Sequence, residues 1–294
     1  MRVLCIGCGS AGRRHIGNLI ALGCEVFVFD MSPAAQEAAF AMGAHPKSIM
    51  GRPPDAVVIA TPWDQHARSV EWALESYQWR PLFIEKPIGT VNQTIRWAEL
   101  AADFQARNIP TQIGYQLRFH PAAQALTSIA KPVLGRFTCD ADMASWPGSN
   151  YGPMLLELSH EVDLALHCGA PSQRIVVDIL RETRAVFSLC GADGRRWRIA
   201  LDGQAGRYHR SWCVGNAGAN IVAEFTQPDA LGVDMYKAEM AHFLNAVRTG
   251  KQSWPAATLA DGVKVLEICH RVMVARRIDE PFDQVASVLA GFSG

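Results

Sequence analysis

An α/β domain followed by an α+β domain is the fold that this sequence predicts. Over the first 115 residues, short apolar runs alternate with amphipathic stretches of helical length. After about residue 130, strand-like runs follow one another with few helices between them. A chain of 294 residues has room for two domains of ordinary size, and we place them at residues 1–118 and 119–294.

The first domain is predicted to be a parallel sheet with helices on both faces. We expect strands at 2–7, 25–29, 56–60, 82–84 and 111–115, and helices at 11–22, 33–42, 65–76 and 91–107. The strands are almost continuously apolar, which is typical of parallel strands buried on both faces. Since crossovers between parallel strands are right-handed, the expected architecture is a doubly wound sheet of Rossmann type.

The second domain is predicted to be built on a mostly antiparallel, open sheet. We expect strands at 135–144, 174–180, 185–189, 196–201, 208–214 and 220–225, and helices at 154–168, 235–249 and 258–276. The stretch 196–201 reads RWRIAL and alternates in part between polar and apolar side chains. Such alternation indicates a sheet with one face exposed to solvent.

The composition argues against several classes of partner. Lys and Arg together number 28, as do Asp and Glu, so the formal net charge is zero. A neutral chain has no electrostatic footprint for nucleic acid or for anionic lipid. The sequence has no run of about 18 apolar residues that could span a membrane, and its first residues begin a strand pattern rather than a signal peptide. We therefore expect a cytoplasmic protein without nucleic-acid or membrane partners.

Two patterns overlap in the stretch CIGCGSAGRRH at residues 5–15. Cys5 and Cys8 have the spacing of a redox dithiol or of half a zinc site, but the other cysteines are scattered and complete no metal tetrahedron. Cys5 lies inside the first predicted strand and Cys8 inside a glycine-rich turn, where nothing activates a thiol. The sequence therefore predicts neither a metal site nor a redox dithiol.

The competing pattern is G-x-G-x-x-G, formed by Gly7, Gly9 and Gly12. Gly7 permits a tight turn, Gly9 lets the backbone approach a pyrophosphate, and Gly12 lets helix and strand pack closely. The helix that starts here offers free N–H groups and a partial positive charge to phosphates. The residues expected to bind a dinucleotide in this turn are Gly7, Gly9, Ser10, Ala11 and Gly12.

Asp30 ends the second predicted strand, 18 residues after Gly12. There a carboxylate can bind both ribose hydroxyls of the adenosine half, and it repels a 2′-phosphate. NAD is therefore the predicted cofactor and NADP is disfavoured, unless Arg13 or Arg14 reaches the ribose and weakens this preference. The alternative is that Asp30 only caps the turn before residues 32–33.

The tripeptide Glu85-Lys86-Pro87 follows the apolar strand 82–84 at its carboxyl end, where ligands collect in open α/β sheets. Most lysines are solvated surface residues. Lys86, however, follows three apolar strand residues and precedes a proline that restricts its backbone. We therefore expect Lys86 to be held at the cleft.

Several motifs together resemble one family. They are GCGSAGRRH at 7–15, ATPWDQH at 60–66, EKP at 85–87, GYQLRFHP at 114–121, LLELSHEVD at 155–163 and YKAEMAHFLNAV at 236–247. In this order they resemble the Gfo/Idh/MocA oxidoreductases, which include glucose–fructose oxidoreductase and inositol dehydrogenase. The resemblance covers nearly the whole chain, and EKP together with the HEVD helix is its most specific part.

The resemblance implies a catalytic pair, Lys86 and His160. Oxidation of a secondary alcohol requires a base for the hydroxyl proton, and the family's helix histidine maps onto His160. The family's lysine maps onto Lys86, which would stabilise charge on the reacting oxygen. The expected reaction is hydride transfer between NAD and a secondary alcohol or ketone of a sugar, inositol or sugar derivative, nucleotide-linked sugars included. The alternative for His160 is a satisfied core histidine.

One position departs from the family pattern. Many members carry an aspartate four residues before the histidine, where this chain has Leu156. Glu157 and Asp163 lie three residues on either side of His160, on one broad face of the expected helix. Either carboxylate could orient the imidazole; equally, Asp163 could satisfy a backbone group while Glu157 faces solvent.

Further contacts with cofactor and substrate are implied. The expected cofactor contacts beyond the glycine turn and Asp30 are Thr61, Pro62, Glu85, Lys86 and Gln116. The expected substrate contacts are Lys86, Arg118, Tyr151, Glu157, His160 and Tyr236. Arg118 could equally be an interdomain salt-bridge partner, and Tyr151 an aromatic plug in an ordinary packed loop.

Two rival functions stay open at the level of sequence. Some relatives use a transient oxidation by NAD to cleave glycosidic bonds or to eliminate a substituent, with no net production of NADH. A non-catalytic sugar or NAD sensor on the same fold is the other rival, although a pure binding protein would not need both Lys86 and His160. The resemblance also suggests a homodimer or homotetramer formed through the exposed sheet face of the second domain.

Overall fold

The computed structural model describes residues 1–143, 154–226 and 234–275. The chain divides into two compact units, Met1–Gln116 with Asp234–Val263, and Leu117–Val233 with Lys264–Gly294. The first transition, after Gln116, lies close to the predicted boundary at residue 118. A late segment of the chain folds with the first unit, which the single boundary drawn from the sequence did not anticipate.

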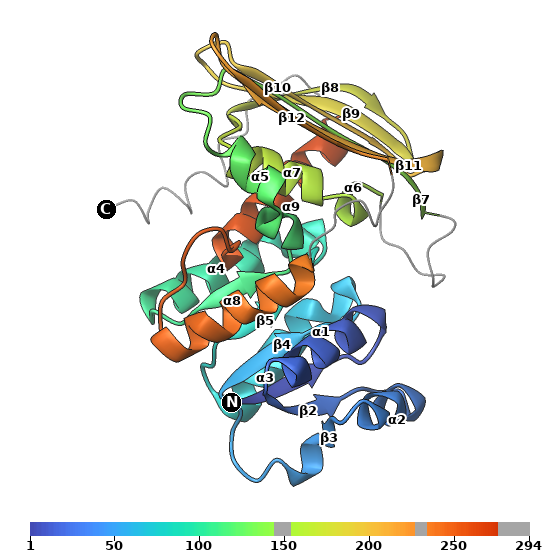
Figure 1. Ribbon diagram of the computed structural model, residues 1–294, viewed down its shortest axis with the longest axis vertical. Helices are drawn as coiled ribbons and strands as arrows, with labels where there is room; N and C mark the ends of the chain where they lie inside the picture. The colour runs from blue at the N-terminus through green and yellow to red at the C-terminus, as the bar shows by residue number, and fades with distance from the viewer. Residues whose placement is uncertain (144–153, 227–233, 276–294) are drawn as a thin grey trace. The chain divides into compact units, whose positions relative to one another are not determined.

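The first unit contains a six-stranded sheet in the order β3-β2-β1-β4-β5-β6 (Figure 1). Its strands are β1 Arg2–Ile6, β2 Glu25–Phe29, β3 His45–Pro46, β4 Ala56–Ile59, β5 Leu82–Ile84 and β6 Thr111–Ile113. All neighbouring pairs are parallel, as in a doubly wound sheet whose topological switch lies between β1 and β4. The predicted Rossmann-type sheet is confirmed. The edge strand β3 was missed because it has only two residues.

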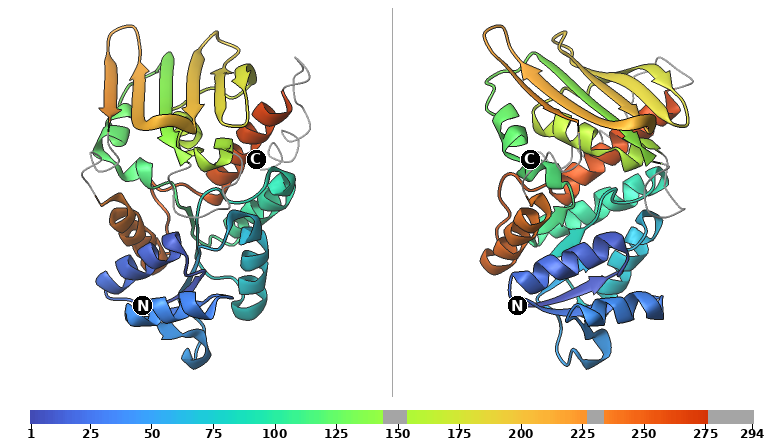
Figure 2. Two further views of the ribbon diagram at one scale, coloured as in Figure 1. Left: turned by 90° about the vertical axis from the view of Figure 1, so that its right-hand side faces the viewer. Right: turned by 45° about the vertical axis from the view of Figure 1, so that its right-hand side comes forward.

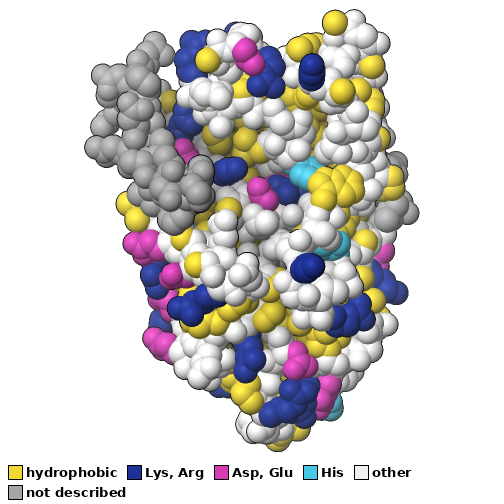
Figure 3. Space-filling view, turned by 90° about the vertical axis from the view of Figure 1, so that its left-hand side faces the viewer, with side chains coloured by type: hydrophobic (Ala, Val, Ile, Leu, Met, Phe, Trp, Pro, Cys, Tyr) yellow, Lys and Arg dark blue, Asp and Glu magenta, His cyan; other side chains and the backbone are white. Residues whose placement is uncertain are grey.

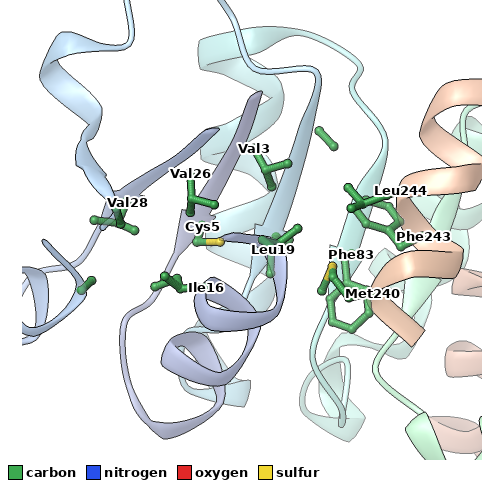
Figure 4. Close-up of a cluster of buried hydrophobic side chains, with 14 of the residues drawn as sticks. Val3, Cys5, Ile16, Leu19, Val26, Val28, Phe83, Met240, Phe243 and Leu244 are labelled. Atoms are coloured by element: carbon green, nitrogen blue, oxygen red, sulfur yellow. The ribbon is translucent and has the colours of Figure 1, made fainter. Parts of the chain in front are cut away.

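Helices pack around this sheet and complete its core. They are α1 Ser10–Ala21, α2 Pro33–Ala41, α3 His66–Tyr77, α4 Thr94–Ala106 and α8 Met235–Thr249. Short 3-10 helices lie at η1 Lys47–Ile49, η2 Trp63–Gln65, η3 Val91–Gln93 and η4 Gln116–Phe119. Met240, Phe243 and Leu244 of α8 join Cys5 and Phe83 in one buried apolar cluster (Figure 4). Because α8 buries its apolar face here, it folds with the first unit, although the sequence analysis assigned it to the second domain.

The second unit contains a six-stranded sheet in the order β12-β11-β7-β10-β9-β8. Its strands are β7 Leu134–Asp142, β8 Arg174–Leu180, β9 Arg184–Cys190, β10 Arg196–Asp202, β11 Gln204–Gly215 and β12 Asn220–Phe225. Only β7 and β10 pair in parallel, and the other neighbours are antiparallel. The predicted mostly antiparallel sheet is therefore confirmed.

One face of this second sheet is apolar and covered by helices. The side chains of Phe137, Trp197 and Trp212 are fully buried on it, and β10 alternates between exposed and buried residues as its sequence predicts. The covering helices α5 Pro121–Leu126, α6 Met154–Glu157 and α7 His160–His167 lie on the same side of the sheet (Figure 2). The last described helix, α9 Leu259–Val274, begins among residues of the first unit and continues in the second.

The helix predicted over residues 154–168 is interrupted. α6 ends at Glu157 and α7 begins at His160. Between them the N–H of Ser159 donates to the carbonyl of Leu156, three residues back rather than four, which breaks the α-helical ladder. The prediction of one continuous helix over residues 154–168 is therefore wrong, and the predicted common face of Glu157, His160 and Asp163 stays a prediction.

Charged side chains of both signs are interspersed over the face of the molecule shown in Figure 3. This pattern agrees with the composition of 28 basic and 28 acidic residues. Among the helices that the structure describes, none is both long and apolar enough to cross a membrane.

Candidate active site

The turn between β1 and α1 is packed so tightly that two of its glycines admit no side chain. Gly7 has a φ of +98°, and a Cβ there would lie 2.5 Å from the carbonyl carbon of Ala60, just past β4. A Cβ on Gly12 would lie 2.0 Å from the carbonyl oxygen of Gly7. Around the Cβ position of Gly9, in contrast, no other part of the chain lies within 4 Å. The turn is closed toward the sheet and open at Gly9.

The start of α1 can receive an anion. Gly9 is the N-cap residue, no side chain caps the helix, and the first turn contains no acidic residue. Gly9 and Ser10 are exposed, and Ala11 is half-buried. The first N–H groups of a helix have no partner within the helix, so an uncapped start presents them to a ligand. This arrangement fits the diphosphate of a dinucleotide.

Asp30 ties the end of β2 to the glycine turn. Its Oδ2 accepts the backbone N–H of Cys8 at 2.6 Å, and its Oδ1 accepts that of Ser32 at 2.8 Å. The turn-capping role considered for Asp30 is therefore present. It does not exclude the cofactor role, because each carboxylate oxygen can accept a second hydrogen bond.

Cys5 and Cys8 are both buried and free. Burial and, after it, the charge of Asp30 raise the pKa of the Cys8 thiol to about 11. Burial also raises the pKa of Cys5. A redox dithiol needs a lowered thiol pKa. The raised pKa values of Cys5 and Cys8 therefore argue against this role. Among the described residues, no group of three or more His, Cys, Asp or Glu side chains could hold a metal ion.

Thr61 and Pro62 follow β4 beside the glycine turn. The backbone nitrogen of Thr61 would lie 2.6 Å from a Cβ on Gly7, so the two loops touch. The Thr61 hydroxyl bonds that of Ser69 at 3.1 Å, and the Thr61 carbonyl accepts from Nε2 of His66 at 2.8 Å. Thr61 therefore lies next to the glycine turn, and the cofactor contacts predicted for Thr61 and Pro62 stay predictions.

Glu85 and Lys86 lie at the carboxyl end of β5, as the sequence predicts. Glu85 is buried and Lys86 half-buried, so Lys86 is not a fully solvated surface lysine. Glu85 Oε1 lies 2.5 Å from Nε2 of His15 on α1, and Oε2 accepts the backbone N–H of Lys86 at 3.0 Å. Burial alone would raise the pKa of the Glu85 carboxyl. The hydrogen bond and charge of His15, followed by Lys86, outweigh burial and lower that pKa, which keeps the group a carboxylate.

Gln116 and Tyr236 meet within the first unit. Gln116 Nε2 donates to the Tyr236 hydroxyl at 2.9 Å, and the guanidinium of Arg14 lies over the Tyr236 ring at 4.1 Å. An expected cofactor contact and an expected substrate contact are therefore neighbours, although they are 120 residues apart in the sequence. Arg14, considered above as a ribose contact, stacks on this tyrosine.

His160 begins α7 in the second unit and is buried. Two ion pairs are formed by residues that follow it on the same helix. Arg210 Nε of β11 lies 2.7 Å from Glu161 Oε1, while Nε and Nη2 of Arg118 donate to the two oxygens of Asp163 at 2.9 and 2.6 Å. The salt-bridge alternative for Arg118 is therefore observed, with Asp163 of the same unit rather than across domains.

The remaining predicted substrate residues differ in how much the structure describes. Glu157 is half-buried at the end of α6, and Leu156 beside it is buried. Tyr151 lies outside the described residues. The roles predicted for Glu157 and Tyr151 stay predictions.

Three residues of these clusters were not singled out from the sequence: His15, Glu161 and Arg210. His15 stands 70 residues before Glu85, so no local pattern links them. Its only sequence signal is that it follows the glycine motif on the face of α1 that also carries Gly12 and Ile16 inward.

Comparison with known proteins adds the family. Residues 1–110 match the family model described as an oxidoreductase family with an NAD-binding Rossmann fold, GFO_IDH_MocA. These residues form a Gfo/Idh/MocA domain. The resemblance drawn from the motifs is thereby confirmed for these residues, and the family model describes them as an NAD-binding domain. No curated protein matches the sequence.

Solved structures resemble the chain beyond the Gfo/Idh/MocA domain. Myo-inositol dehydrogenase from Lactobacillus casei superposes with a TM-score of 0.78 at 18% identity, covering 96% of both chains. UDP-N-acetylglucosamine 3-dehydrogenase from Acidithiobacillus ferrooxidans gives 0.75 at 22% identity, over 94% of this chain and 97% of that one. The WlbA dehydrogenase from Bordetella pertussis gives 0.76 at 18% identity, over 96% and 99%. At these identities the likeness establishes the two-domain fold.

Proposed function

We propose that this protein is an NAD-dependent dehydrogenase or reductase that acts on a secondary alcohol or ketone of a polyhydroxylated small molecule. The observation that carries the proposal is the position of Lys86. It lies two residues after the last residue of β5, at the carboxyl edge of a Gfo/Idh/MocA sheet, and it is half-buried, with its backbone N–H bound by the Glu85 carboxylate. Ligands of doubly wound sheets bind at this edge.

The first unit has the parts of an NAD site. The open, uncapped start of α1 around Gly9, Ser10 and Ala11 suits the diphosphate. Asp30, which follows β2, would accept hydrogen bonds from the adenosine ribose, and this role favours NAD over NADP. The remaining proposed cofactor contacts are Thr61, Pro62, Glu85, Lys86 and Gln116. When bound, NAD supplies a nicotinamide carbon that accepts or returns hydride.

His160 and Lys86 have different roles toward the reacting oxygen. In oxidation, an imidazole nitrogen of His160 takes the hydroxyl proton as the carbon loses hydride. The ammonium group of Lys86 donates a hydrogen bond to the same oxygen and stabilises its negative charge until the carbonyl forms. In reduction, His160 returns the proton to the oxygen. The ion pairs of Glu161 and Asp163 hold the helix that carries His160.

A sugar, an inositol or a sugar derivative, nucleotide-linked sugars included, is the proposed substrate class. It is supported by the substrates that the similar solved structures name, myo-inositol and UDP-N-acetylglucosamine among them. Arg118, Tyr151, Glu157 and Tyr236 are the proposed substrate contacts beside the catalytic pair.

A panel of sugars, polyols and nucleotide sugars, read at the absorbance of NADH, tests the function. We expect NADH production from at least one member of the panel. Lys86→Ala and His160→Ala should each lower kcat by about 100-fold or more, while either variant within a few-fold of wild type would refute the catalytic pair. Product formation without net production of NADH would identify a redox-neutral enzyme. Binding of NADH without turnover of any compound in the panel would identify a sensor.

We also propose a cytoplasmic homodimer or homotetramer. All eight cysteines are free, as expected in a reducing compartment. The open face of the second sheet, which carries Arg196 and Arg198 of β10, is the proposed contact surface. Light scattering on the purified protein distinguishes these states from a monomer.

A further inference from the structure

The side chain of Glu85 links Lys86 to the first helix of the protein. Its Oε2 accepts the backbone N–H of Lys86 at 3.0 Å, and its Oε1 lies 2.5 Å from Nε2 of His15. A carboxylate can only accept hydrogen bonds, so Nε2 of His15 is the donor. Through one buried carboxylate, α1 therefore reaches the backbone of the lysine at the proposed reaction centre.

Water does not compete for this link. His15 is 0% exposed and Glu85 is 8% exposed. The His15 ring packs edge-on against Phe83 at 4.8 Å, and Phe83 in turn packs against Phe243 of α8. In such surroundings a hydrogen bond to a charged group is strong, and loss of one partner leaves the other unsatisfied.

Gly114 lies against the Glu85 carboxylate. A Cβ on Gly114 would lie 3.0 Å from Oε2 and 3.2 Å from Cδ of Glu85. Gly114 follows β6, and its N–H donates to the carbonyl of Ile84 at 2.9 Å. The Glu85 side chain thus fills a space that Gly114 leaves open, with His15 at its other end, which restricts it to one position.

A second histidine faces the same turn. His66 of α3 is buried and donates from Nε2 to the Thr61 carbonyl at 2.8 Å. The charge of Glu85 and the backbone of Pro87 and Ile88 also act on its imidazole. Histidines of two helices, α1 and α3, therefore lie near the turn that carries Lys86. Of the three turn residues 85–87, only Lys86 is more than marginally accessible.

We propose that His15 is a positioning residue for Lys86: by holding the Glu85 carboxylate, it fixes the backbone at Lys86 and with it the position of the ammonium group. This inference rests on the proposed function, in which Lys86 stabilises charge on the reacting oxygen. Displacement of a reacting group by about 1 Å can lower turnover about 100-fold. His15 itself needs no contact with substrate or cofactor.

Two substitutions of His15 separate positioning from simple packing. His15→Phe fills the same space against Phe83 and cannot donate to Glu85. His15→Gln keeps an N–H donor at the end of the side chain. A matched control is His209→Phe, because Nε2 of His209 lies 2.7 Å from Glu224 Oε1 in a His–Glu pair on β11 and β12 of the second unit.

Three measurements are made on each full-length variant. The first is kcat and KM, for NAD and for the best compound of the panel. The second is the rate at which an amine-acylating reagent modifies Lys86 relative to the exposed Lys237, determined by peptide mass spectrometry, which needs no substrate. The third is the thermal unfolding midpoint, which reports any general loss of stability.

In His15→Phe we expect kcat to fall 10- to 100-fold, about the loss that a misplaced reacting group causes. KM for NAD should stay within about threefold, and Lys86 should be modified at least about threefold faster because it is no longer held. In His15→Gln, kcat and the modification rate of Lys86 should both return most of the way to the wild-type values. In His209→Phe, neither quantity should change. The inference is overturned if Lys86 modification is unchanged in His15→Phe, or if His15→Gln and His15→Phe lose activity equally. Normal turnover in Lys86→Ala would instead refute the proposed function. If no compound of the panel reacts, the modification rates of Lys86 alone still test whether His15 positions it.

Discussion

The guanidinium of Arg118 and the carboxylate of Asp163 form a bidentate ion pair in the interior of the second unit. The side chains are only 5% and 1% exposed. Asp163 lies three residues after His160 on α7, and Arg118 belongs to the short helix η4. The pair therefore ties the helix that begins with the proposed base to the segment that enters the second unit.

Removal of one partner should destabilise the protein strongly. Asp163→Ala leaves the buried Arg118 charge without this carboxylate, so the free energy of unfolding should fall by about 3–5 kcal/mol in urea denaturation. The double variant Arg118→Met with Asp163→Leu should recover most of the loss, because neither charge is then buried.

The control for this experiment is Glu99→Ala. Glu99 pairs with Arg96 at 3.2 Å, but both side chains are about half exposed, and such surface pairs contribute at most about 1 kcal/mol. If Asp163→Ala costs no more than Glu99→Ala, the buried pair does not hold α7 in place.

The glycine turn gives a second prediction, in which stability and cofactor binding separate. Gly9→Ala meets no other part of the chain, so its unfolding midpoint should stay within about 2 °C of wild type. Its methyl group should nevertheless obstruct the diphosphate and weaken NADH binding at least about tenfold, as measured by fluorescence titration. Gly12→Ala should instead lower stability by about 1–3 kcal/mol, because its Cβ would overlap the Gly7 carbonyl.

Gly218→Ala serves as the reference for the two glycine variants. Its nearest neighbour would be Asn216 Oδ1 at 3.8 Å, an ordinary contact. NADH affinity equal to wild type in Gly9→Ala would contradict the assignment of this turn to the diphosphate.

The periodicity of the sequence was sufficient for both sheets but not for every boundary. The apolar strands of the first unit and the alternation along 196–201 predict their sheets because burial on one or both faces imposes those patterns. Periodicity does not say which sheet a helix covers. The assignment of α8 therefore needed the observation that Phe243 packs near Phe83.

In the candidate site, too, local sequence patterns predict single residues but not the contacts between residues that are far apart in the sequence. Gly7, Gly12 and Lys86 were predicted because each stands at a defined point of a strand or turn. The link from His15 to Glu85 spans 70 residues, and a single sequence does not encode such a contact in any local pattern. The break at Ser159 was missed because the surrounding residues are good helix formers.

Asp30 provides a third prediction, on cofactor preference. Its charge should repel a 2′-phosphate, so Asp30→Asn should reduce the preference for NADH over NADPH by about tenfold, which corresponds to about 1.4 kcal/mol. The amide keeps one oxygen that can accept from Cys8 or Ser32. Fluorescence titrations with both nucleotides measure the ratio of dissociation constants.

Loss of a negative charge at an unrelated surface position should not change the ratio of the dissociation constants for NADH and NADPH. Asp103→Asn, on an exposed position of α4, is the control. An unchanged ratio in Asp30→Asn would show that another residue selects the cofactor and that Asp30 serves only to join the two loops.

The buried His66 predicts how stability depends on pH. Burial lowers its pKa below the usual value of 6.5, against the Thr61 carbonyl and the Glu85 charge, which act to raise it. The folded protein thus keeps the imidazole neutral, whereas the unfolded chain takes up a proton as the pH falls through 6.5. Since the unfolded state binds more protons, this contribution to stability is present at pH 7 and is lost on acidification.

We expect wild type to lose up to about 2 kcal/mol more stability than His66→Gln between pH 7 and pH 5. The glutamine amide can still donate to the Thr61 carbonyl but does not titrate in this range. Urea denaturation at both pH values measures the difference, with His45→Gln at an exposed position of β3 as the control. Equal losses in wild type and His66→Gln would mean that His66 has the same pKa in the folded protein as in the unfolded chain, so that it takes up a proton in the folded protein before pH 5.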